Sequence, residues 1–404
     1  MLEKQRSVGQ LLPSKKIKVP NRRLCLQRQK SRQLFKRQHT FQNLSNTPEP
    51  YDVNNNTETV DDPEFQHTSK VHRLLLKHTK FGFIKSFANL SINDPDETRR
   101  TISESDQVIQ KFPSPDDILQ EPEISAKIIN KESFHIGQLL GSGGFGAVYL
   151  GIYKDQKVAI KVMHKYTKNP TAQVESFKAE LLVMRFHHPN IVQTLAATHI
   201  DQFGEGAWVI MEYVNKSTLQ TLLNETTEEF NAKRRLKYAI QLASALAYAH
   251  SNKIAHLDLK PSNVLITESD DCKIGDFGCC QQVNYGVGIE SPSCRSALTG
   301  TFAYRAPELL KGEPPTFKAD IYSYGVTLWQ LKSRDIPYAN HNPHVVIFGV
   351  VANGLRPTDP NPSETDPFEL SYRDLYQQCW KASPLNRPSA RELVDLLNIW
   401  KENL

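Results

Sequence analysis

The chain has 404 residues, of which 39% are hydrophobic and 23% are charged, and its formal net charge is +5. No run approaches the roughly 18 consecutive apolar residues of a membrane span, and the first residues lack the apolar stretch of a secretion signal. The six cysteines show no metal-ligand spacing such as C-x-x-C, and a reducing compartment is the simpler interpretation. These features predict a cytoplasmic protein with no membrane contact.

The first third of the sequence differs from the rest. Residues 1–50 hold twelve Lys or Arg against two acids, and from about 51 to 130 the balance turns mildly acidic, with Pro and Asn interruptions. This composition predicts disorder over residues 1–130. A solvated arm is the simplest interpretation of the basic part, and the alternatives are a segment that binds nucleic acid, an acidic surface or a docking partner. Dense apolar runs then predict one folded domain over residues 131–402.

The folded region opens with FHIGQLLGSGGFGAVY, which predicts a strand, a glycine-rich turn and a second strand. The turn reads G-x-G-x-x-G, a motif shared with plain hairpins and with dinucleotide-binding folds. Strand-like residues follow here, not the helix of a dinucleotide-binding fold, which favours a flap whose backbone approaches phosphates. Leu140 and Val148 would pack against adenine. The predicted ATP-binding residues of the flap are Leu140, Gly141, Ser142, Gly143, Gly144, Phe145, Gly146, Ala147 and Val148.

The next strand contains V-A-I-K, which places Lys161 within reach of the α- and β-phosphates of ATP. The segment VESFKAELLVMRFHH has helical apolar spacing and carries Glu180, the expected ion-pair partner of Lys161. A lysine on a strand or a glutamate on a helix is usually solvated. The assignment of Lys161 and Glu180 therefore depends on the other motifs of the chain. We also assign three residues further along the chain to the ATP site: Met211, Glu212 and Tyr213.

Residues 256–263 read HLDLKPSN, and H-x-D-x-x-x-x-N is typical of the catalytic loop of a protein kinase. Asp258 would orient the substrate hydroxyl, Lys260 would steady the transferring phosphoryl group, and Asn263 would bind Mg²⁺. In DCKIGDFG, Asp276 is predicted to be the principal magnesium ligand. The amphipathic stretch RRLKYAIQLASALAYAH before the loop predicts a core helix that delivers it to the site.

Two further motifs predict structural contacts. Glu308 of the A-P-E triplet is expected to form a buried pair with Arg387, and Asp320 of KADIYSYG is expected to hydrogen-bond the backbone of the catalytic loop. Any one motif could be accidental. Six motifs in this order and at these intervals make an accidental match far less plausible.

Together the motifs resemble those of eukaryotic protein kinases over residues 131–402. The resemblance implies a bilobal α+β fold with a small β-rich N-terminal lobe and a larger helical C-terminal lobe. Lys260 and Thr301, in GTFAYRAPE, resemble the serine/threonine form. HLDLKPSNVLI, CKIGDFGCC, YRAPELLKGE and KADIYSYGVTLWQ are similar to the Mos family of oocyte kinases.

The Mos resemblance implies ATP and Mg²⁺ as cofactors and MAP kinase kinases as protein substrates, phosphorylated on serine or threonine during meiosis. A monomer with no specific nucleic-acid partner is expected. One alternative is a serine/threonine kinase of another cytosolic pathway. Another is an inactive kinase-fold scaffold, which would have lost one of the catalytic residues named above.

Leu257 stands where most kinases have an arginine that pairs with an activation-loop phosphate. Leucine cannot make that contact, so we expect the catalytic loop to take its active shape by packing. Activity would then be set mainly by the amount of protein. The activation segment, between Asp276 and Glu308, still carries five serine and threonine residues: Ser291, Ser293, Ser296, Thr299 and Thr301.

Overall fold

The structure is a computed structural model. The part of the chain that it describes comprises residues 127–129, 133–166, 169–199, 206–225, 227–283 and 302–403. The proposed disordered region therefore lies outside the described residues, apart from 127–129. Within those three residues, Ile128 forms a parallel bridge with Ala197, and the Nζ of Lys127 donates to the carbonyl of Met184 at 2.9 Å. Contacts with the folded domain thus begin slightly before residue 131.

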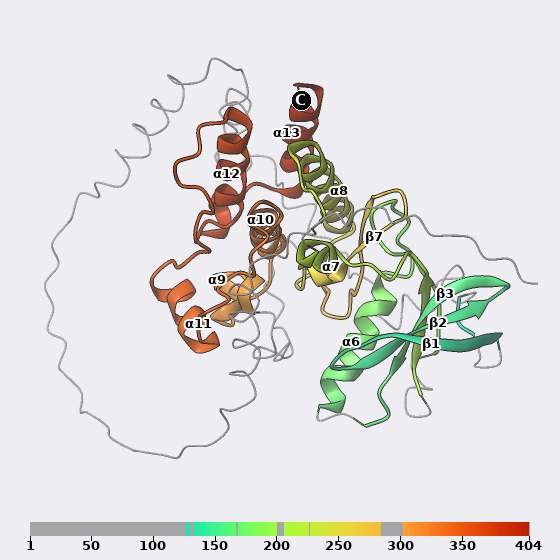
Figure 1. The fold of residues 1–404 in the computed structure, drawn as a ribbon. Coiled ribbons are helices and arrows are strands. Elements are labelled where there is room, and N and C mark those ends of the chain that lie inside the picture. Colours follow the sequence, from blue (N-terminus) through green and yellow to red (C-terminus); the bar gives the residue numbers. More distant parts are fainter. Residues whose placement is uncertain are drawn as a thin grey trace, which may run out of the picture. The chain divides into compact units, whose positions relative to one another are not determined.

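The N-terminal lobe contains an antiparallel sheet in the order β1-β2-β3-β5-β4. Its first three strands lie side by side in Figure 1. β-branched and aromatic residues suit its strands, and Val158, Ile160 and Trp208 are buried in a small core on one side. The register places Val148 opposite Lys161 and Ala159 opposite Met211. The strands are β1 Phe134–Ser142, β2 Gly146–Tyr153, β3 Gln156–Met163, β4 Thr194–Ala197 and β5 Trp208–Glu212.

One helix, α6 (Pro170–Leu182), connects β3 to β4. Asn169 caps its start by accepting a hydrogen bond from the backbone N–H of Ala172, and Pro170 occupies the first helical position, where a missing N–H costs nothing. Glu180 lies in the last turn of this helix and is buried. The predicted helix that carries Glu180 is therefore present.

The C-terminal lobe is mainly helical, and its other helices surround α10 (Figure 1). The residues of α10 from Ala319 to Leu331 are all buried. α8 packs against α10 and α13. The elements are α7 Leu219–Asn224, α8 Ala232–Ser251, β6 Ile254–Ala255, η3 Pro261–Asn263, β7 Val264–Ile266, β8 Cys272–Ile274, β9 Gln281–Gln282, η4 Phe302–Tyr304, α9 Pro307–Leu310, α10 Phe317–Ser333, α11 Pro343–Ala352, α12 Pro367–Cys379, η5 Pro384–Asn386 and α13 Ala390–Asn403.

The predicted α+β architecture, with a β-rich first lobe and a helical second lobe, is confirmed. Among the described residues, no helix is both long enough and apolar enough to cross a membrane.

Candidate active site

The glycine-rich flap joins β1 to β2 and is closed by a hydrogen bond from the N–H of Gly143 to the carbonyl of Gly146 at 2.8 Å. A Cβ on Gly146 would lie 2.5 Å from the carbonyl oxygen of Val162, so only glycine fits there. By contrast, a Cβ on Gly141 or Gly144 would meet no atom within 4 Å. The flap therefore packs tightly on β3 at Gly146 and leaves open space along its exposed backbone.

The other predicted ATP-binding residues lie along the same sheet. On the flap, Ser142 is exposed and Phe145 is half-buried, while Ala147 beyond it is buried. Leu140 and Val148 are half-buried at the ends of the flap, as a surface for an apolar ring requires. Next to β3, the strand β5 carries Met211 and Glu212, and Tyr213 directly follows it.

Lys161 joins two carboxylates from distant parts of the chain. Its Nζ lies 2.7 Å from Oε1 of Glu180 and 2.8 Å from Oδ1 of Asp276. Burial by itself would lower the pKa of Lys161, but the attraction of Asp276 and Glu180 outweighs it and raises that pKa. The attraction of Lys161 in turn lowers the pKa of Asp276 to about 2. Lys161 and Asp276 are therefore both charged at neutral pH.

Glu180 differs from Asp276 because only 2% of its side chain is exposed, against 51% for Asp276. Burial raises the pKa of Glu180, and the attraction of Lys161 opposes that rise. Without the lysine, the glutamate would be a buried and unpaired acid. The pair therefore holds α6 against β3, while Asp276 keeps an exposed carboxylate edge.

The catalytic loop brings three predicted residues together. Oδ2 of Asp258 accepts hydrogen bonds from Nζ of Lys260 at 2.7 Å and from Nδ2 of Asn263 at 3.0 Å. The same nitrogen of Asn263 also donates to the backbone carbonyl of Asp258 at 2.9 Å. These bonds fix the Asp258 carboxylate within the loop.

Asp320 of α10 holds the backbone of the catalytic loop through hydrogen bonds. Its fully buried carboxylate accepts the backbone N–H of His256 at 2.8 Å and of Leu257 at 2.7 Å, the contact expected from the sequence. Nε2 of His250 lies 2.8 Å from the same carboxylate. Burial would raise the pKa of Asp320, but the hydrogen bonds from His250 and Leu257 and the nearby histidines lower it. The Asp320 carboxylate is therefore ionised and accepts hydrogen bonds from several donors.

Leu257 has a left-handed backbone with a φ of 62°, which costs an ordinary residue about 1–2 kcal/mol. Its side chain is only 7% exposed and belongs to the main apolar core. The bond to Asp320 and this packing therefore hold a strained loop conformation.

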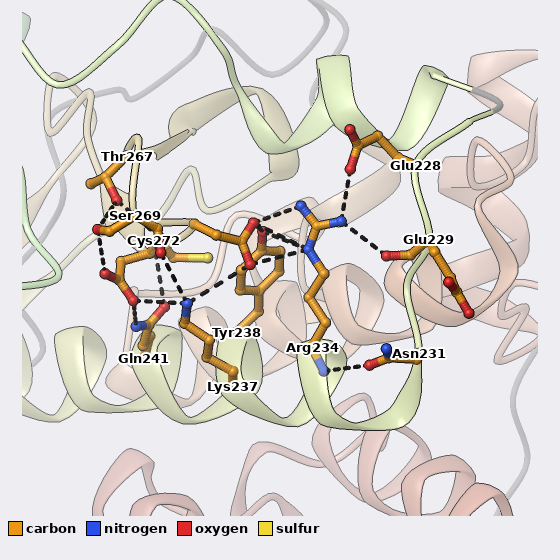
Figure 2. A network of polar contacts seen from close by, with 12 residues as sticks. Glu228, Glu229, Asn231, Arg234, Lys237, Tyr238, Gln241, Thr267, Ser269 and Cys272 are labelled. Carbon is orange, nitrogen blue, oxygen red and sulfur yellow. Dashed lines mark hydrogen bonds and ion pairs between the residues drawn. The ribbon is translucent and has the colours of Figure 1, made fainter.

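The hairpin β7–β8 carries both predicted metal ligands, because Asn263 precedes β7 and Asp276 follows β8. Figure 2 shows how the turn of this hairpin is attached to α8. Arg234 pairs with Asp270 at 2.6 Å and with Glu228 at 2.7 Å, and Gln241 donates to Asp271 at 2.7 Å. α8 thus holds the far end of the hairpin, and its polar residues carry no motif that would have revealed this from the sequence.

Arg387 and Glu308 form the expected tie in the C-terminal lobe, with two bonds of 2.6 and 2.8 Å. Both side chains are buried. The five hydroxyl residues of the activation segment, from Ser291 to Thr301, lie outside the described residues. We expect the hydroxyl of Thr301 to contact Asp258 and Lys260, and this stays a prediction.

The donor set of Asp276 and Asn263 fits a hard divalent cation. Both offer oxygen, since the amide nitrogen of Asn263 is used by Asp258 and its Oδ1 is the atom available to a cation. In the described ranges, no cluster of three or more His, Cys, Asp or Glu could hold a metal ion. Mg²⁺ is a hard ion of this kind, which takes one or two carboxylate or other oxygen ligands from a protein and completes its shell with water and phosphate oxygens.

Comparison with known proteins decides the family. The model of the protein kinase domain matches residues 134–397. The chain is 47% identical to a serine/threonine-protein kinase mos from Patiria pectinifera over 267 residues, which cover 66% of this chain and 75% of that protein. It is 41% identical to the Xenopus laevis kinase of the same name over 287 residues, covering 69% of this chain and 79% of that protein. The chain belongs to the Mos family of serine/threonine protein kinases.

A third Mos kinase, from Gallus gallus, is 40% identical over 314 residues, covering 72% of this chain and 88% of that protein. Membership of this family makes the chain a serine/threonine protein kinase that uses ATP with a divalent metal ion and acts on proteins. The inactive-scaffold alternative is therefore set aside.

Proposed function

We propose that this kinase transfers the γ-phosphate of magnesium ATP to serine or threonine in the activation loops of MAP kinase kinases during oocyte meiosis. The observation that carries the proposal is that Lys161, Glu180 and Asp276 meet in one cluster while Asp258, Lys260 and Asn263 meet in another. Similarity to Mos kinases supports the choice of substrate and pathway. A monomer acting in the cytoplasm is the simplest state for this role.

On the nucleotide side, the flap backbone and Lys161 would hold the phosphates, and Leu140 and Val148 would enclose the adenine. Asp276 and Asn263 would hold Mg²⁺, which neutralises charge on the phosphate oxygens when bound. Lys161 already carries a stable positive charge because two carboxylates raise its pKa. Charge neutralisation and positioning supply most of the catalysis in phosphoryl transfer.

On the substrate side, Asp258 would orient the attacking hydroxyl and take its proton. The hydroxyl oxygen forms a bond to the γ-phosphorus, the bond from phosphorus to the β–γ bridging oxygen breaks, and ADP leaves. Lys260, bonded to Asp258 in the structure, would steady the transferring group. The geometry of Asp258 is fixed by Asn263 and by the bonds between Asp320 and the loop backbone.

Leu257 supports a second part of the proposal, which concerns regulation. The loop reaches this conformation with Leu257 packed in the core and its N–H bonded to Asp320. An arginine at this position would need a counter-charge such as phosphate, whereas leucine needs none. Activity is then controlled mainly through the amount of protein.

The experiment is incubation of the purified full-length protein with labelled ATP, Mg²⁺ and candidate substrates. Each MAP kinase kinase is paired with a variant whose activation-loop serine and threonine residues are replaced by alanine. Label on the intact substrate and none on the alanine variant would support the proposal. Efficient label on another protein class, with MAP kinase kinases unlabelled, would move the kinase to a different pathway.

A further inference from the structure

The side chain of Gln173, on α6, joins two other segments of the N-terminal lobe. It is 3% exposed, and its Nε2 donates to the carbonyl of Phe145 in the flap and to the carbonyl of His164 just after β3, each at 2.8 Å. Both amide hydrogens are therefore used. Losing them would remove one donor from the carbonyl of each of these two half-buried residues.

Gln173 lies two helical turns before Glu180, so the two side chains share one face of α6. Ser176 lies between them on that face and is buried. Its Oγ would be 2.5 Å from a Cβ placed on Gly278, directly after Asp276 and Phe277. One face of α6 thus contacts the flap, Lys161 and the segment that carries Asp276.

His164 adds to the attachment of the flap. Its backbone N–H donates to the Phe145 carbonyl at 2.9 Å, and its Nε2 lies 3.0 Å from the carbonyl of Gly143. The Phe145 carbonyl therefore receives donors from both His164 and Gln173. The tip of the flap is bonded to the chain between β3 and α6, beyond the ladder that joins β1 and β2.

We propose that Gln173 is a positioning residue that links the placement of α6 to the closed shape of the flap. When Glu180 pairs with Lys161, the same helix brings Gln173 to the Phe145 carbonyl, so the lysine and the flap reach their phosphate-binding positions together. The inference rests on the proposed role of the flap in binding ATP phosphates. It assigns to α6 a second contact with the nucleotide site, separate from the Lys161–Glu180 pair.

The test uses two substitutions of nearly the same shape. Gln173→Glu replaces the amide with a carboxyl group that repels both carbonyls when ionised, and Gln173→Met removes the donors without adding charge. We expect both variants to raise KM for ATP about tenfold, equivalent to about 1.4 kcal/mol, and to change kcat at saturating ATP less than threefold. Gln220→Glu, on α7 and bonded to Asn224, is the matched control and should leave KM unchanged.

The pH dependence of KM distinguishes a hydrogen-bonding role of the Gln173 side chain from a packing role. A carboxyl group at this buried position has its pKa raised by desolvation, so acidification protonates it and restores one donor. KM of Gln173→Glu, relative to wild type, should therefore recover between pH 8 and pH 6, while that of Gln173→Met should not. Amide hydrogen exchange of residues 141–146 should be faster in Gln173→Met than in wild type.

An unchanged KM for ATP in both variants, with unchanged exchange in the flap, would overturn the inference. A loss of kcat in proportion to a lowered unfolding midpoint, with no effect on KM, would show a purely structural residue and would also overturn it. If wild type itself did not bind ATP, the proposed function would fail and the inference with it. Unchanged variants of an ATP-binding wild type would refute the inference alone.

Discussion

Lys161 and Glu180 meet through one pair of side chains from β3 and α6, whereas Asp258 lies on a loop whose backbone is bonded to the buried helix α10. On the nucleotide side, Asp276 is half exposed and reaches Lys161 across 115 positions of sequence. On the substrate side, Asp320 is fully buried and holds two consecutive backbone N–H groups.

The difference teaches which part of the site can change without loss of the fold. Contacts between side chains of separate segments can be removed and leave each segment's own packing intact. Contacts that pair two buried charges cannot be removed in this way, because the charge that remains is buried without a partner. Loss of Lys161 leaves Glu180 buried without its partner, but that cost falls on the N-terminal lobe. The C-terminal lobe should therefore stay folded when the nucleotide side is changed, whereas loss of its own buried ties should destabilise it.

The largest expected effect is on the nucleotide side. Lys161→Met and Asp276→Ala should each lower kcat/KM at least about 1,000-fold, equivalent to about 4 kcal/mol, because charge at the phosphates is no longer balanced. The thermal unfolding midpoint of the C-terminal lobe should stay near that of wild type. Lys157→Met, an exposed lysine on the same strand, is the control and should remain active. Wild-type turnover in either active-site variant would contradict the assignment.

The opposite behaviour is expected from Arg387→Met. It leaves Glu308 buried without its partner, and breaking a buried pair in this way costs about 3 kcal/mol or more of unfolding free energy. Denaturant unfolding measures the loss. Arg391→Met, at a position where 80% of the side chain is exposed, should cost much less. If the two arginine variants were equally stable, the buried tie would have no special role.

A smaller effect is expected where the proposed N-terminal region meets the domain. We propose that residues 1–130 are dispensable for catalysis, so a variant that starts at Ser125 should keep its rate within about twofold. A matched variant that starts at Glu132 loses the bonds of residues 127–129 to Ala197 and Met184. It should lose about 3 kcal/mol of stability, at about 1 kcal/mol for each of these three bonds. Loss of folding in the longer variant would refute the proposed boundary.

The smallest effect is expected from the activation segment. Replacing Ser291, Ser293 and Ser296 together with alanine should leave the rate near that of wild type, because Leu257 needs no phosphate. Wild type treated with phosphatase should phosphorylate its substrate at nearly the rate of untreated wild type. A loss of about tenfold or more, equivalent to about 1.4 kcal/mol, would show that another basic residue senses phosphate.

The sequence predicts the elements that carry motifs, because these residues serve chemistry with fixed offsets along the chain. The flap, the Lys161–Glu180 pair and the Glu308–Arg387 tie all follow from such offsets and are present in the structure. The kinase architecture follows from the same motifs.

The contacts that the sequence does not predict are polar contacts to partners with no sequence signature. Gln173 binds two carbonyls, which every residue possesses, so its spacing carries no information. The pairing of Arg234 with Asp270, and the contact of His250 with Asp320, depend on how α8 packs against a turn and against α10. Only the folded arrangement reveals which of many similar polar residues meet.

The most direct test of the account is to identify the residue that receives phosphate. Purified wild type, incubated with labelled ATP, Mg²⁺ and a MAP kinase kinase, is compared with Asp276→Ala by phosphoamino acid analysis of the substrate. The account predicts label on phosphoserine or phosphothreonine with wild type and almost none with the variant. Label confined to phosphotyrosine, or equal label from both proteins, would contradict it.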